Sequence, residues 1–109
     1  MRLRKRKNLD SRLENCGKYF MTSMGEPLNM KEAAAQKAYF DFENMFENNN
    51  PIHLEIGCGC GKFACDLAEQ NKDINLIAVE KNINAIVKGC ERAKESKLEN
   101  LRFFQVFFV

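Results

Sequence analysis

The chain has 109 residues, of which 45% are hydrophobic and 29% are charged, and its formal net charge is +2. This composition is typical of a folded domain and excludes a disordered tail or a fibrous protein. No apolar run approaches the roughly 18 to 20 residues of a membrane-spanning helix, and the basic start is not followed by the apolar stretch of a secretory signal. We therefore expect a cytoplasmic protein with one domain.

Residues 1–28 show no sustained periodicity and contain turn-forming glycine and proline, so they are predicted to form an extended N-terminal arm. Basic side chains crowd the start of this arm: Arg2, Arg4, Lys5, Arg6 and Lys7. Such a run is either a solvated, flexible segment or a surface that pairs with the phosphates of a nucleic acid.

A helix is predicted to begin near Asn29, because Glu32 stands at the spacing of a helix-start capping pair. Apolar side chains then recur at helical intervals as far as Phe46. The asparagines at 48–50 and Pro51 predict the end of this helix, since asparagine accepts turn geometry and proline disfavours helix in the residue before it.

Strands and helices are predicted to alternate after this stop. Residues 52–56 form a short strand-like run, and a glycine-rich loop leads into a helix whose buried face spans 63–68. The continuous apolar run 74–79 is typical of a strand covered on both faces, and helical spacing over 83–90 precedes a third strand at 101–109. The order β-α-β-α-β predicts a parallel sheet with right-handed crossovers.

The loop after the first of these strands is the main candidate for chemistry. Glycines at Gly57, Gly59 and Gly61 permit positive φ angles and let a ligand approach the backbone. Open α/β sheets bind cofactors at the carboxyl ends of their strands, where this loop lies. Glu55 precedes the loop, and Glu80 closes the second strand, where it could accept hydrogen bonds from both hydroxyls of a ribose. This combination predicts a nucleoside cofactor.

The charges around the loop indicate which nucleoside. A dinucleotide fingerprint counted from Gly57 needs glycine where Lys62 stands, and one counted from Gly59 ends on Ala64, a permitted but weaker fit. The carboxylate of Glu55 would repel a pyrophosphate, whereas S-adenosylmethionine carries a sulfonium and an ammonium and no phosphate. The residues favour S-adenosylmethionine, and an NAD-binding Rossmann fragment is the alternative.

Three segments of the chain together resemble the tRNA (guanine-N7-)-methyltransferases: residues 2–4, 50–57 and 78–81. The resemblance implies a partial Rossmann-like methyltransferase fold over residues 29–109, preceded by the arm. It implies methyl transfer from S-adenosylmethionine to guanine N7 in the variable loop of tRNA. By matching position, Glu55 and Glu80 would contact the cofactor, and the three glycines would shape its loop.

The chain departs from the family pattern at three places. Cys60 stands where family members commonly have lysine, and Phe107 stands where a polar side chain usually meets the adenine. The chain also stops before the family's fourth strand, its Asp-Pro-Trp-Pro-Lys-type motif and its tRNA-binding residues. We therefore expect the catalytic residues beyond the C-terminus and a 109-residue chain that is poorly active or inactive alone.

The remaining candidates are interpreted as structural. The five cysteines lack paired zinc-ligand spacing and are interpreted as free thiols in a reducing compartment. His53 is expected to be structural or to face solvent, and no metal site is predicted.

The first strand is expected to have an exposed edge, and the phenylalanines at 103–108 are expected to lack part of their cover. Both features predict self-association. The rival to an enzyme is a non-catalytic nucleic-acid-binding fragment that uses the basic arm.

Overall fold

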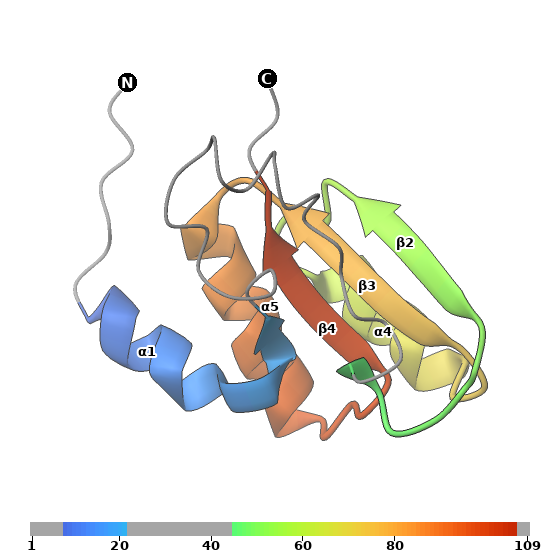
Figure 1. The fold of residues 1–109 in the computed structure, drawn as a ribbon. Helices are drawn as coiled ribbons and strands as arrows, with labels where there is room; N and C mark the ends of the chain where they lie inside the picture. Colours follow the sequence, from blue (N-terminus) through green and yellow to red (C-terminus); the bar gives the residue numbers. More distant parts are fainter. Residues whose placement is uncertain (1–7, 22–44, 107–109) are drawn as a thin grey trace, which may run out of the picture.

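The computed structural model describes residues 8–21 and 45–106, and Figure 1 shows the order of the elements within them. The elements are α1 (Leu9–Cys16), the 3-10 helix η1 (Gly17–Tyr19), β1 (Phe20–Met21), β2 (Ile52–Ile56), α4 (Lys62–Gln70), β3 (Asn75–Glu80), α5 (Ile83–Glu95) and β4 (Leu101–Gln105). None of the helices in these ranges has the length and apolarity needed to cross a membrane.

The described strands form one parallel sheet with the order β1-β4-β3-β2. β2, β3 and β4 alternate with α4 and α5 along the chain, so the predicted β-α-β-α-β unit and the α/β class are confirmed. β2 lies at one edge of this sheet and β1 at the other (Figure 1). The parallel direction places the carboxyl ends of all strands at the same end of the sheet.

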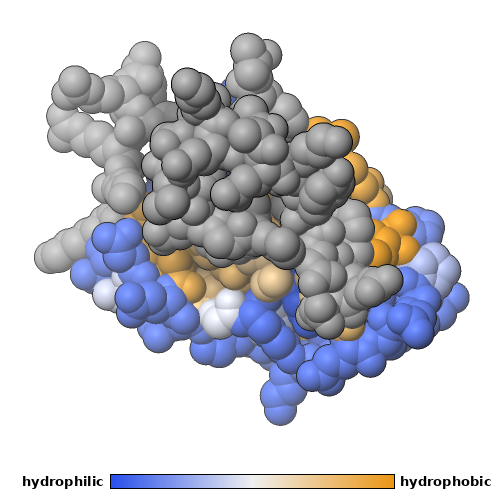
Figure 2. Space-filling view, viewed as in Figure 1, coloured by the Kyte–Doolittle hydropathy of each residue, from blue (hydrophilic) through white to orange (hydrophobic). Residues whose placement is uncertain are grey.

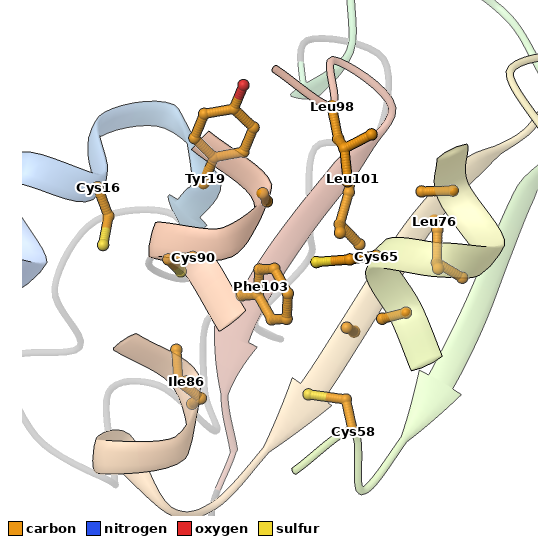
Figure 3. Packing of buried hydrophobic residues seen from close by; sticks show 14 of the residues in the cluster. Cys16, Tyr19, Cys58, Cys65, Leu76, Ile86, Cys90, Leu98, Leu101 and Phe103 are labelled. Atoms are coloured by element: carbon orange, nitrogen blue, oxygen red, sulfur yellow. The ribbon is translucent and has the colours of Figure 1, made fainter. Parts of the chain in front are cut away.

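The larger core fills the space between the sheet and the helices α1, α4 and α5. It is centred on Phe103, which is completely buried and lies between α5 and α4 (Figure 3). Alternate residues of the strands, such as Leu76 and Ala78 of β3, point to this face because side chains alternate along a strand. Ile86 and Cys90 of α5 complete the contact from the helix side.

The opposite face of the sheet carries a smaller apolar cluster. Ile77, Val79 and Phe104 pack there against Met45 and Phe46. Phe104, like Phe103 on the helix face, is therefore buried. The expectation that these two phenylalanines would lack cover is wrong, because each face of β4 is packed within the described part of the chain.

The N-terminal segment differs from the predicted extended arm over residues 9–21. Leu9 and Cys16 of α1 are buried in the larger core, and Arg12 forms a two-pronged ion pair with Glu91 of α5, with N···O distances of 3.0 and 2.6 Å. β1 then pairs with β4, placing Phe20 beside Phe103. Tertiary contacts stabilise a helix and strand too short to be evident from periodicity.

Several sequence predictions lie outside the described residues. These are the conformation of residues 1–7 with their basic side chains, the helix start near Asn29, the domain boundary after residue 28, and the role of Phe107. From the predicted helix around 29–46, the structure describes Met45 and Phe46, both of which are buried. β4 is described as far as Gln105.

Candidate functional site

The glycine-rich loop connects the carboxyl end of β2 to α4 and is tied to the end of β3. The backbone N–H groups of Gly57 and Cys58 both donate to the carbonyl of Val79, at 2.8 and 3.1 Å. The N–H of Gly61 donates back to the carbonyl of Cys58 at 3.0 Å, closing a tight turn. These hydrogen bonds hold the loop across the carboxyl ends of β2 and β3, the place where open α/β sheets bind ligands.

Gly61 is constrained both by its backbone and by its surroundings. Its φ angle is +75°, and a Cβ added there would lie 2.8 Å from the ring of Phe103. Gly89 of α5 faces the same ring, with an added Cβ at 2.7 Å from it and 3.3 Å from the carbonyl oxygen of Cys60. The loop, α5 and β4 thus meet at a point where only glycine fits on two sides of one aromatic ring.

Glu55 lies one residue before the end of β2, beside Ala78 of β3, on the face that carries the helices. Its Oε2 atom is buried and has no hydrogen-bond partner among the described residues. Burial raises the pKa of this carboxyl above its usual value. Burying an acceptor that has no donor costs free energy, so this atom fits a site at which a ligand supplies the donor or an opposite charge.

Glu80 ends β3 and reaches across to the glycine loop. Its Oε1 accepts a hydrogen bond from the N–H of Gly59 at 3.3 Å, and its Oε2 accepts one from the N–H of Asn82 at 2.8 Å. Asn82 in turn caps α5, accepting from the N–H groups of the first turn. Each carboxylate oxygen can accept a further bond, so Glu80 fixes the loop and can still receive ligand hydroxyls.

Cys58 lies within the electrostatic reach of both carboxylates. Burial, followed by the negative charges of Glu55 and Glu80, raises the pKa of its thiol to about 12. Cys58 therefore remains a protonated thiol near neutral pH and is unsuited to act as a nucleophile. Glu55 and Glu80 therefore both lie near enough to this thiol for their charges to act on it.

The structure brings five predicted cofactor residues to one end of the sheet: Glu55, Gly57, Gly59, Gly61 and Glu80. Two carboxylates at this end favour a cationic ligand that also offers hydroxyl groups. His53 is exposed, as expected, and Cys60 is an exposed free thiol. Within residues 8–21 and 45–106, no group of three or more potential ligands could hold a metal ion.

Three residues near the site were not identified from the sequence. Gly89 of α5 and Phe103 of β4 lie close to the glycine loop. Their contact depends on the packing of two elements that are separate in sequence. Asn82 could have been recognised, since asparagine directly before an apolar helical period is a common helix cap. The basic residues 2–7 lie outside the described part of the chain, so their proximity to this site stays a prediction.

A parallel sheet with a glycine loop after one strand and a carboxylate at the tip of the next is the arrangement of a partial Rossmann-like fold. A family model described as "Putative methyltransferase" matches residues 49–106, more than half of the chain. The chain belongs to this methyltransferase family, and its predicted resemblance to the tRNA (guanine-N7-)-methyltransferases is confirmed by curated relatives.

Three of these relatives carry the name tRNA (guanine-N(7)-)-methyltransferase. The chain is 38% identical over 103 residues to the protein of Clostridioides difficile and 34% identical over 106 residues to that of Streptococcus agalactiae. It is 45% identical over 65 residues, 60% of its length, to the protein of Brevibacillus brevis. The first two matches include 94% and 97% of this chain but 44% and 45% of the relatives, and the third 30% of its relative.

Proposed function

We propose that this chain carries the S-adenosylmethionine-binding part of a tRNA (guanine-N7-)-methyltransferase. The observation that supports the donor most directly is the buried, unpartnered Oε2 atom of Glu55 beside the glycine loop. The sulfonium or ammonium of the donor would give this carboxylate an opposite charge, which favours its ionised form. A pyrophosphate in the same place would be repelled by Glu55 and Glu80 together.

On this proposal the remaining residues orient the donor. Glu80, already held by the N–H groups of Gly59 and Asn82, accepts hydrogen bonds from the ribose hydroxyls. Glycine permits the positive φ angles that the loop adopts at Gly57, Gly59 and Gly61. At Gly57 and Gly59 the missing side chain also leaves open space beside the loop, where the ligand would lie. S-adenosylmethionine supplies an electrophilic methyl group when bound.

The acceptor and partner are proposed from the names of the relatives and from the chemistry of guanine. Guanine N7 carries an unprotonated lone pair, so no general base is needed for attack. Acceleration would come mainly from the in-line alignment of the nitrogen, the methyl group and the sulfur.

We place Arg2, Arg4, Lys5, Arg6 and Lys7 on the tRNA phosphates, in the cytoplasm. Since the chain spans less than half of two relatives, we further propose that the acceptor side belongs to the remainder and that this chain alone is inactive.

Calorimetric titration of the 109-residue chain with S-adenosylhomocysteine tests the donor site. We expect binding at millimolar or lower concentration that is lost in Glu80→Ala and retained in Glu95→Ala, an exposed carboxylate at the end of α5. Equal losses in both variants, or binding of NADH in place of S-adenosylhomocysteine, would contradict the proposal.

Two further experiments separate the rival functions. Salt-sensitive tRNA binding without any nucleoside binding would support the non-catalytic nucleic-acid-binding fragment. A methyl-transfer assay on tRNA is expected to show no turnover by this chain alone. Turnover would overturn the inactivity and leave the donor site supported.

A further inference from the structure

Two buried thiols meet where α1 packs on α5. Cys16, the last residue of α1, is 1% exposed, and Cys90 of α5 is completely buried. Both belong to the larger core, and Figure 3 shows them next to one another, each on its own helix. The two side chains share a hydrogen bond, and the thiol of Cys16 also donates to the carbonyl of Arg12 at 3.2 Å. More than half of the chain separates the two cysteines in sequence, so the fold brings them together.

Polar contacts beside the thiols hold the two helices together. Arg12, one turn before the first cysteine, pairs with Glu91, which directly follows the second. Lys94, one turn after the second cysteine, donates to the carbonyl of Asn15, which directly precedes the first. Sequence neighbours of each cysteine therefore already contact the other helix. A covalent bond between the sulfur atoms requires them to approach from hydrogen-bonding distance to bonding distance.

The shared hydrogen bond makes the two thiols chemically unequal. It lowers the pKa of the Cys16 thiol, because the S–H of Cys90 stabilises the Cys16 thiolate. The positive charges of Lys94 and Arg12 add to this effect, against the opposing effects of burial and of Glu91. The same hydrogen bond, together with burial, raises the pKa of Cys90. Cys16 is therefore the thiol of this pair that is suited to react first with an oxidant.

Opening of α1 gives small solutes access to Cys16. The helix has eight residues, of which Leu9 and Cys16 are buried. Figure 2 shows mostly hydrophilic surface where α1 lies in Figure 1, so the outer side of this helix adds little to its attachment. A helix of this length is not stable apart from its tertiary contacts. Local detachment of α1 therefore exposes Cys16 without unfolding the sheet.

We propose that Cys16 and Cys90 are a redox modification site, a pair of thiols that hydrogen peroxide converts reversibly into a disulfide. The Cys16 thiolate attacks one oxygen of the peroxide, the S–O bond forms, and the O–O bond breaks. The hydroxide that leaves takes up one thiol proton and becomes water. When α1 closes again, the sulfur of Cys90 displaces the hydroxyl group of the Cys16 sulfenic acid, which leaves as a second water with the other thiol proton.

The balance of this step is two thiols oxidised to one disulfide and one peroxide reduced to two waters. A dithiol reductant restores both thiols by exchange. While the bond exists, α1 is covalently attached to α5 and cannot leave the core. The inference stands on the contact between the two helices and does not depend on the proposed methyl-donor site.

Peroxide treatment of the unmodified chain tests the pair. After treatment, the remaining thiols are alkylated in denaturant and the peptides are mapped without reduction. We expect the peptides of Cys16 and Cys90 to be joined with the loss of two hydrogens, and dithiothreitol to remove the link. Because the bond closes a loop over residues 16–90, the thermal midpoint of the oxidised chain should be higher than that of the reduced chain by about 5 °C or more.

Matched variants show whether the link depends on this particular contact. Cys16→Ala and Cys90→Ala should each lose the link. Cys65→Ala is the control and should retain it, because Cys65 is buried in the same core but its thiol donates to the carbonyl of Gly89, at 3.8 Å. The exposed Cys60 also reacts with peroxide, and its own peptide reports that reaction separately.

Four outcomes would overturn the proposal. Cys16 and Cys90 could both stay reduced while Cys60 is oxidised, or Cys16 could be linked to a cysteine other than Cys90. The link could be lost in a folded Cys65→Ala variant, or it could form without raising the thermal midpoint. The first, second and fourth outcomes are read from the unmodified chain, so the test does not require any variant to fold.

Discussion

The ring of Phe103 fills the space that a Cβ on Gly61 would require, with its nearest atom 2.8 Å from that position. One aromatic residue on β4 thereby supports the loop at which we place the methyl donor. Substituting Gly61 tests how far this contact determines both the stability and the shape of the loop.

Gly61→Ala is expected to lower the free energy of unfolding by about 2 to 4 kcal/mol, from backbone strain at positive φ plus overpacking against the ring. Gly57→Ala is the matched control: its φ is also +75°, but no atom lies within 4 Å of the added Cβ. The control should lose only about 1 to 2 kcal/mol. Urea unfolding measures both, and equal losses would contradict the proposed role of Phe103.

Gly89→Ala should destabilise the chain although alanine is the better helix former. The gain in helix propensity, roughly 1 kcal/mol, is opposed by the added Cβ at 2.7 Å from Phe103. We expect a net loss of about 1 to 2 kcal/mol. In a double-mutant cycle with Phe103→Leu, the combined loss should be smaller than the sum of the single losses, and strict additivity would count against the contact.

In the absence of ligand, the stability of Glu55→Gln relative to the parent chain should increase as the pH rises. Because burial raises the pKa of Glu55 in the folded chain, that chain binds more protons than the unfolded chain above the ordinary glutamate pKa of about 4.3. The unfolding free energy of the parent therefore falls as pH increases through this window, and the variant is spared that loss. Unfolding midpoints against pH measure the difference, with Glu69→Gln, at an exposed position of α4, as control; parallel profiles for parent and Glu55→Gln would contradict it.

Cys60 should be the cysteine that alkylates first in the native chain. It is exposed, whereas Cys16, Cys58, Cys65 and Cys90 are buried, and burial is the leading cause that raises the pKa of Cys58 to about 12 and of Cys65 to about 11. Iodoacetamide treatment near pH 8 followed by peptide mass spectrometry measures the order. Modification of Cys58 at the rate of Cys60 would show that the loop opens in solution.

The parts of the fold that were predictable from the sequence are those with a local signal. The first full strand was predicted over Ile52–Ile56, its observed bounds, because Pro51 and Gly57 delimit it on both sides. The glycine loop and Glu80 were predictable because they follow strands directly. The alternation of strands and helices could be predicted from local sequence patterns alone.

The missed features depend on residues distant in sequence. Two residues, Phe20 and Met21, form β1 only because β4 offers them an edge, and α1 buries few side chains of its own, Leu9 and Cys16. The burial of Phe103 could not be predicted without the packing of α5 and the loop around it. The orphaned oxygen of Glu55 is likewise a property of the assembled site.

The pairing of β1 with β4 joins segments from nearly opposite ends of the described chain. While a ribosome is still making the protein, Phe20 and Met21 emerge long before Phe103 and Phe104 exist, and contacts so far apart along the chain form slowly. The early segment therefore stays without its strand partner until β4 has been made. Assembly of this edge of the sheet is consequently a late event, and the nascent chain offers chaperones an apolar target until β4 arrives.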